Sequence, residues 1–160
     1  MSISLENVTF RFARSESVAI KNIDLKIRRG EVVGILGATG SGKTTLLSLL
    51  NGLIPREVRG QLTGRVLVDG LDVKNYSVPE MTEHVGMVLP DPTLSIVGIT
   101  VEDDLAFGPT WLGLATEEIQ ERVKWAAEMV RLSGYEKRNT SYLSGGEQQA
   151  LCIGGVLALK

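Results

Sequence analysis

The stretch that most constrains this chain is a glycine-rich segment between two apolar runs. It reads Gly37-Ala38-Thr39-Gly40-Ser41-Gly42-Lys43-Thr44-Thr45, which has the G-x-x-x-x-G-K-T spacing of a phosphate-binding P-loop. The β-branched run over residues 31–36 predicts a buried strand before it, and the apolar residues after it predict a helix over 44–53. A strand, a glycine turn and a helix in this order are the context in which the motif binds phosphate.

The residue types in this loop suit a polyphosphate ligand. Glycines let backbone N–H groups turn toward an anion without interference from a Cβ atom, and the helix that follows directs its positive end at the same place. Lys43 can reach the β- and γ-phosphates, and the hydroxyl of Thr44 can ligate Mg²⁺. We therefore predict a nucleotide site formed by the whole loop, 37–45, with Mg²⁺ held through Thr44.

Composition and charge narrow the class of protein. The chain has 160 residues, 43% of them apolar and 22% charged, which is enough for one compact domain with a core. The net charge of −2 gives no electrostatic reason to expect a nucleic-acid partner. Cys152 is the only cysteine, so an internal disulfide is excluded and a reducing compartment is expected. We see no signal peptide and no apolar run as long as a membrane span. If the protein functions at a membrane, another subunit would have to hold it there.

Strands and helices are predicted to alternate along the chain, which indicates an α/β domain. Alternating apolar residues predict strands over 3–12 and 18–27, a strand before the tight turn Asp69-Gly70, and a further buried strand over 85–89. Helices are predicted over 100–107, 116–133 and 144–159, with Thr100 and Thr116 as N-caps of the first two. Trp125 lies outside the apolar face of the helix predicted over 116–133 and is expected to pack at the edge of the core.

A second informative motif opens the last helix, Leu143-Ser144-Gly145-Gly146-Glu147-Gln148-Gln149. Ser144 and Glu147 have the spacing of a capping box. Capping does not require two consecutive glycines, which lower helix stability. Bare N–H groups at a helix start can bind an anion, so the motif predicts a second anion site.

These two motifs together resemble the ATP-binding cassette (ABC) ATPases, whose signature motif reads Leu-Ser-Gly-Gly-Glu/Gln-Gln. The resemblance implies a P-loop NTPase fold with an N-terminal antiparallel β subdomain and a helical subdomain, and it implies ATP and Mg²⁺ as cofactors. Cassettes of this family pair head to tail, as a homodimer or a heterodimer. Ser144, Gly145, Gly146 and Glu147 would then contact the ATP that is held by the P-loop of the second cassette.

Other segments resemble further parts of the family. Residues 5–12 resemble its first strand, which would place Phe12 against the adenine ring, although burial in the core is the alternative for a Phe. Residues 88–93 resemble its Q-loop region. Residues 100–109 and 112–114 resemble the energy-coupling-factor and cobalt-type importers of vitamins and metal ions. This branch implies integral membrane partner subunits and a place on the cytoplasmic face of the membrane.

The sequence departs from the family pattern at several positions. Pro90 stands where the family has the Q-loop glutamine, and a proline offers no side-chain donor or acceptor. Ala150 stands where a basic residue is usual. The Walker B carboxylates, the D-loop and the switch histidine are not found in 1–160, and His84, expected to be a solvated side chain, precedes the signature. We therefore expect a partial ABC domain that ends before Walker B, the N-terminal part of a longer cassette, and we assign no catalytic residue.

Several functions remain open at this point. The leading one is the ATP-binding subunit of an ABC importer, with hydrolysis by this chain alone in doubt. The second is a degenerate, non-catalytic ATP-binding half of an asymmetric cassette pair, or a gene fragment. A third is a soluble ABC protein of DNA repair or translation, which would usually carry long coiled coils or a basic linker, and neither is visible in this sequence. A P-loop kinase or GTPase is disfavoured by the signature motif and by the lack of an Asn-Lys-x-Asp element.

Overall fold

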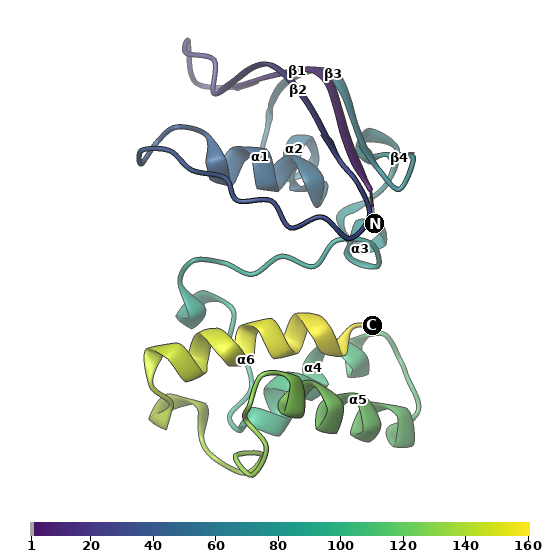
Figure 1. The fold of residues 1–160 in the computed structure, drawn as a ribbon, viewed down its shortest axis with the longest axis vertical. Coiled ribbons are helices and arrows are strands. Elements are labelled where there is room, and N and C mark those ends of the chain that lie inside the picture. Colours follow the sequence, from purple (N-terminus) through teal and green to yellow (C-terminus); the bar gives the residue numbers. More distant parts are fainter. Residues whose placement is uncertain (1) are drawn as a thin grey trace. The chain divides into compact units, whose positions relative to one another are not determined.

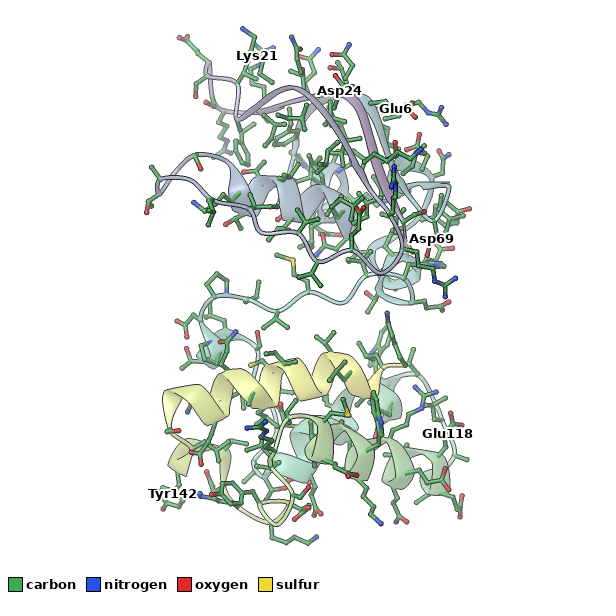
Figure 2. All side chains as sticks on the ribbon, viewed as in Figure 1. Glu6, Lys21, Asp24, Asp69, Glu118 and Tyr142 are labelled. Carbon is green, nitrogen blue, oxygen red and sulfur yellow. The ribbon has the colours of Figure 1, made fainter. Side chains whose placement is uncertain are left out.

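The computed structural model describes residues 2–160, which fold as two compact units, one up to Val85 and one over Gly86–Lys160. Figure 1 shows a β-sheet with short helices in the first unit and a group of helices in the second. The two units are described separately below. Figure 2 labels six exposed side chains: Glu6, Lys21 and Asp24 on strands and Asp69 in a turn of the first unit, and Glu118 and Tyr142 in the second unit.

The first unit is built on a four-stranded antiparallel sheet with the strand order β2-β1-β3-β4. The strands are β1 (Ile3–Phe12), β2 (Ile20–Ile27), β3 (Gly60–Val68) and β4 (Leu71–Asp72). Ile3 pairs with Ile27 on one side and with Val68 on the other, so the register places apolar residues together. Asp69 and Gly70 both have positive φ, at 48° and 82°, which confirms the predicted tight turn after β3.

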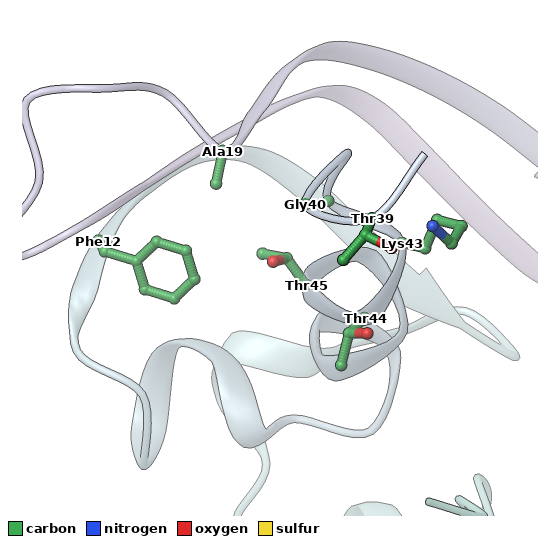
Figure 3. Close-up of a pocket in the computed structure, with 8 residues that line it drawn as sticks. Phe12, Ala19, Thr39, Gly40, Lys43, Thr44 and Thr45 are labelled. Carbon is green, nitrogen blue, oxygen red and sulfur yellow. The ribbon is translucent and has the colours of Figure 1, made fainter. Parts of the chain in front are cut away.

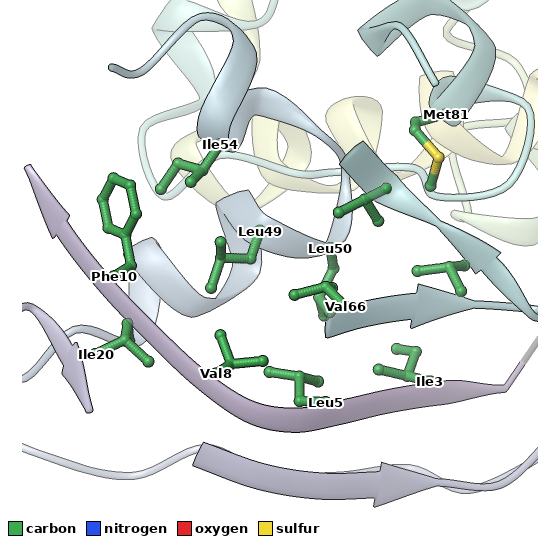
Figure 4. Close-up of a cluster of buried hydrophobic side chains, with 12 residues drawn as sticks. Ile3, Leu5, Val8, Phe10, Ile20, Leu49, Leu50, Ile54, Val66 and Met81 are labelled. Atoms are coloured by element: carbon green, nitrogen blue, oxygen red, sulfur yellow. The ribbon is translucent and has the colours of Figure 1, made fainter. Parts of the chain in front are cut away.

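Short helices cover the buried face of this sheet. They are α1 (Lys43–Leu50), α2 (Leu53–Arg56), the 3₁₀ turn η1 (Val73–Asn75) and α3 (Val78–Thr82). Figure 4 shows Leu49, Leu50 and Ile54 from the helices facing Val8, Phe10 and Val66 from the strands. The fully buried core of the unit is Val8, Phe10, Leu49, Ile54, Val66, Val68, Val73 and Met81. This core fixes α1 on the sheet, and with it the glycine loop that precedes α1.

Two predicted strands are absent from the described residues, and both predictions were wrong for this structure. Residues 31–36 and 85–89 have no strand assignment, and no strand of residues 2–160 pairs with them. Val32 is fully exposed and Leu36 is 96% exposed. Apolar, β-branched residues favour a strand, but a strand also needs a neighbour to receive its backbone hydrogen bonds. Without a paired neighbour among residues 2–160, the local preference of both segments does not produce a strand.

The second unit is helical. It contains the 3₁₀ turns η2 (Pro92–Leu94) and η3 (Thr140–Tyr142) and the helices α4 (Val101–Trp111), α5 (Thr116–Met129) and α6 (Gly145–Ala158). The three helices pack on one another around the buried residues Val101, Leu105, Ala126, Ala127, Leu132, Leu143, Leu151 and Ala158. Trp125 is 45% exposed, and its packing at the edge of this core stays a prediction.

The helix ends follow the sequence signals in most places. Thr100 caps α4 through a capping box with Asp103, as predicted for Thr100. The cap predicted at Thr116 was wrong, because the N-cap position of α5 is Ala115 and no side chain caps it. The end of α5 also lies before the predicted residue 133. Arg131 adopts a left-handed conformation with φ 61°, and a helix cannot continue through that geometry.

Candidate functional site

The predicted P-loop joins an exposed segment to α1. The helix begins at Lys43, directly after Gly42, and no side chain caps its N-terminus. The first N–H groups of an α-helix have no partner inside the helix, so those of Lys43, Thr44 and Thr45 are available to a ligand. Together with the positive end of the helix dipole they suit an anion.

Three glycines give this loop its course. Gly40 and Gly42 have φ values of 81° and 92°, which residues with a Cβ rarely adopt. A Cβ atom on Gly42 would also lie 2.8 Å from the carbonyl oxygen of Ala19. A Cβ atom on Gly37 would lie 2.7 Å from the hydroxyl oxygen of Ser41, so the loop is closed tightly on itself. The glycine spacing thus meets both a conformational and a steric requirement.

The Lys43 side chain lies inside the curve of the loop. Its ammonium group donates hydrogen bonds of 2.8 Å to the carbonyl oxygens of both Gly37 and Ala38. These bonds place a positive charge beside the uncapped start of α1. The donors gathered here are an ammonium group, helix N–H groups and threonine hydroxyls, and this donor set fits a phosphate chain.

A pocket of about 370 Å³ opens beside the loop and extends to the end of β1. It is lined by Phe12, Ala19, Thr39, Gly40, Gly42, Lys43, Thr44 and Thr45. Figure 3 shows the Phe12 ring facing the side chain of Thr45. Phe12 is 37% exposed and its ring packs edge-on against the buried Phe10, with 5.0 Å between centroids. The pocket therefore has a cationic end at Lys43 and an aromatic end at Phe12.

The signature segment lies in the second unit, at the start of α6. The Ser144 hydroxyl accepts a hydrogen bond from the Glu147 N–H at 3.3 Å, and a Glu147 carboxylate oxygen accepts one from the Ser144 N–H at 2.6 Å. The capping box predicted from the sequence is confirmed. Gly145 and Gly146 are exposed, and Cβ atoms at these positions would meet nothing within 4 Å. Their glycine character is therefore not explained by packing within the chain.

Glu147 has a second partner that the sequence did not reveal. The Arg138 guanidinium lies 3.8 Å from its carboxylate, stacks on the Tyr135 ring at 4.8 Å and donates a 3.1 Å hydrogen bond to the Tyr142 carbonyl. The hydrogen bond from the Ser144 backbone N–H is the main cause that lowers the pKa of Glu147 below its ordinary value of 4.5. Glu147 therefore stays a carboxylate to lower pH than an unperturbed glutamate would.

Comparison with known proteins identifies the family. A family model described as ABC transporter matches residues 20–160, which is most of the chain. The chain belongs to the ABC transporter family. Among curated proteins, a Pyrococcus horikoshii protein named "Putative ABC transporter ATP-binding protein" is 40% identical over 158 residues, and a Pyrococcus abyssi protein of the same description is 39% identical. The alignments cover 99% of this chain but 56% of each relative, so the chain spans about half the length of these relatives.

Solved structures of ABC proteins share the fold. CbiO1 from Clostridium perfringens, described as part of the ABC transporter complex cbiONQ, matches with a TM-score of 0.86 and 29% identity. The match covers 98% of this chain and 61% of CbiO1. The ATP-binding cassette MJ0796, solved as a dimer bound to ADP and Pi, matches with a TM-score of 0.79 and 27% identity, covering 69% of its chain. The predicted fold class, a P-loop ABC cassette with an antiparallel β part and a helical part, is confirmed.

The structure assigns each predicted ABC site residue to one of the two units. It brings Phe12 together with Thr39, Gly40 and Gly42–Thr45 in one pocket, while the signature residues 144–147 belong to the other unit. Ala19 also lines the pocket and was missed, because a small apolar residue before a strand carries no signal of its own. Arg138 was missed for a different reason, since its partners are spread over residues 135–147.

The departures from the ABC pattern are also placed. Pro90 is exposed, just before η2, and Ala150 is half-buried on α6. His84 is half-buried, less exposed than the solvated side chain that was predicted. It follows the end of α3, where its backbone N–H donates to the Met81 carbonyl. Over residues 2–160, no cluster of three metal-ligating side chains occurs. Within the same range, every helix is too short or too polar to cross a bilayer.

Proposed function

We propose that this chain is the ATP-binding part of an ABC importer subunit of the energy-coupling-factor type, which takes up vitamins or metal ions. The observation that carries the nucleotide assignment is the pocket with Lys43 at one end and Phe12 at the other. The importer type is supported by the likeness to CbiO1, which is part of a cbiONQ transporter complex. It is also supported by residues 100–109 and 112–114, which resemble segments of the energy-coupling-factor and cobalt-type importers.

Each site residue has a distinct proposed role toward Mg²⁺-ATP. Lys43 and the first N–H groups of α1 bind the β- and γ-phosphates, and the Thr44 hydroxyl contributes to the Mg²⁺ shell. Phe12 stacks on the adenine ring, an interaction with little selectivity for the base. Mg²⁺ neutralises charge on the phosphates when it is bound.

The signature residues act on a second cassette in this proposal. Ser144 and the exposed N–H groups at Gly145 and Gly146 contact the nucleotide of the paired cassette, and binding closes the pair. Closure drives integral membrane subunits, with the cassette held through them at the cytoplasmic face. The dimer of MJ0796 with ADP and Pi supports pairing as a property of this fold.

Pro90 favours a second candidate function, a non-catalytic cassette that binds ATP and pairs with a catalytic partner cassette. A proline cannot ligate Mg²⁺ or position water through its side chain. Both candidates share the nucleotide site and differ in turnover. They are separated by measuring phosphate release with and without an added partner cassette.

The first test is titration of the purified chain with mant-ATP and Mg²⁺. We expect saturable binding that is weakened at least tenfold by Lys43→Ala, because the main phosphate-binding charge is lost. Lys26→Ala removes the same charge from an exposed position on β2 and serves as the control. Equal binding by the wild type and by Lys43→Ala would contradict the nucleotide site.

A further inference from the structure

Two segments of the second unit lie antiparallel and joined by hydrogen bonds, residues 97–102 and residues 136–140. Three backbone bonds of 3.0–3.1 Å connect them, from Thr140 to Ile99, from Val101 to Arg138 and from Glu102 to Glu136. Thr100 and Asn139 form an isolated β-bridge between them. An ion pair between Lys137 and Glu102 adds a side-chain link. The segment before α4 and the segment before the signature are therefore one hydrogen-bonded structure.

Two buried polar side chains fasten this structure at Gly98. The Asp104 carboxylate, 8% exposed, accepts hydrogen bonds from the N–H groups of Val97 at 2.8 Å and Gly98 at 2.9 Å. The Thr140 hydroxyl, 6% exposed, donates a 2.9 Å bond to the Gly98 carbonyl. A Cβ atom on Gly98 would lie 2.2 Å from the Asp104 backbone nitrogen, so this close approach needs glycine. We refer to Gly98, Asp104 and Thr140 as the clasp.

The clasp is connected to the signature segment by hydrogen bonds. The Thr140 carbonyl accepts a bond from the Gln148 side-chain amide at 3.4 Å, and Gln148 lies in the first turns of α6. Arg138, whose carbonyl is bonded to Val101, also holds the Tyr142 carbonyl. Tyr142 is two residues before Ser144. Ser144 thus lies between Tyr142 and Gln148, and both of these residues are hydrogen-bonded to the segment 138–140.

We propose that Asp104 and Thr140 are positioning residues that set the place of the signature N–H groups through the backbone N–H and carbonyl of Gly98. The segment that they hold is otherwise open to solvent, because Val97 is 61% exposed and Ile99 is 72% exposed. Hydrogen bonds, in addition to the packing of Leu143 in the core of the unit, therefore connect residues 97–99 to residues 140–147. The inference rests on the proposed function for its meaning, since the signature acts on nucleotide only in that proposal.

The experiment compares Thr140→Val with Thr140→Ser by amide hydrogen exchange on the same purified chain. Val has nearly the volume of Thr but cannot donate to the Gly98 carbonyl, whereas Ser restores the donor. We expect exchange at residues 141–147 to be about fivefold faster in Thr140→Val, the effect of losing one hydrogen bond, and to return toward the wild-type rate in Thr140→Ser. Thr116→Val, at an exposed threonine that caps nothing, is the matched control.

A second readout separates positioning from general loosening. Exchange within α5, residues 116–129, should not change in Thr140→Val, and mant-ATP affinity should stay within about twofold of the wild type because the P-loop belongs to the other unit. Association with a second cassette in Mg²⁺-ATP should weaken. Equal exchange at 141–147 in Thr140→Val and wild type, or equal acceleration in α5, would overturn the clasp. Absence of mant-ATP binding by the wild type would remove the proposed function and leave the exchange comparison to decide the clasp alone.

Discussion

A Cβ atom on Gly42 would lie 2.8 Å from the carbonyl oxygen of Ala19. The glycine that directly precedes α1 is therefore held against the backbone that leads into β2. Gly42→Ala should destabilise the chain by more than the roughly 1–2 kcal/mol that a left-handed alanine costs, because the backbone contact must also be relieved. Urea unfolding would measure the change in free energy.

Gly40→Ala is the matched control for this prediction. Gly40 has nearly the same φ, 81°, but a Cβ atom there would meet nothing within 4 Å. Its substitution should cost only the backbone term. A Gly40 variant as unstable as the Gly42 variant would show that the contact with Ala19 contributes nothing.

Phe12→Ala should weaken mant-ATP binding by about fivefold, the value of one aromatic stacking contact of about 1 kcal/mol. Phe12→Tyr should preserve the affinity, and GTP should bind nearly as well as ATP because stacking does not distinguish the bases. Trp111→Ala, an exposed aromatic residue on α4, provides the control. Full affinity in Phe12→Ala would assign Phe12 to packing against Phe10 instead.

The capping box of α6 predicts a dependence of stability on acid pH. Hydrogen bonds from Ser144, the backbone N–H first, lower the pKa of Glu147 in the folded chain below its ordinary value of 4.5. A lowered pKa stabilises the folded state above the unfolded value of the pKa, and this stabilisation is lost as pH falls through the folded value. Glu147→Gln should therefore unfold at lower urea concentration than the wild type near pH 7. The two midpoints should converge as pH falls below about 4.5, and a constant difference at every pH would count against this carboxylate.

Two neighbouring glycines of α6 predict opposite effects. A Cβ atom on Gly154 would lie 2.8 Å from a methyl carbon of Leu105 and 3.2 Å from one of Val130, whereas a Cβ atom on Gly155 would meet nothing within 4 Å. Gly154→Ala should destabilise the helical unit by about 1–3 kcal/mol through overpacking. Gly155→Ala should stabilise α6 by up to about 1 kcal/mol through helix propensity. Thermal unfolding of both variants checks the sign, and equal shifts would contradict the packing of Leu105 and Val130 on Gly154.

Local sequence signals determined the elements whose stability is local. The turn at Asp69-Gly70 and the caps at Thr100 and Ser144 could be predicted because each depends on hydrogen bonds or φ values within about four residues. The alternation of apolar residues over 3–12 predicted β1, because the apolar residues are those on its buried face. The P-loop could be found for the same reason, since its function requires fixed residue types at fixed spacing.

The tertiary structure alone decided what depends on distant neighbours. Residues 31–36 have the residue pattern of a strand, yet no described strand pairs with them. A strand needs a neighbour for its backbone hydrogen bonds, and the residue types of a segment do not provide one. Ala19 became part of the pocket lined by Phe12 and Lys43 only because the start of β2 passes beside Gly42. The clasp joins Gly98 to Thr140 across 42 residues. Local chemistry thus fixed the motifs of this ABC-family chain, and long-range hydrogen bonding and packing fixed what holds them in place.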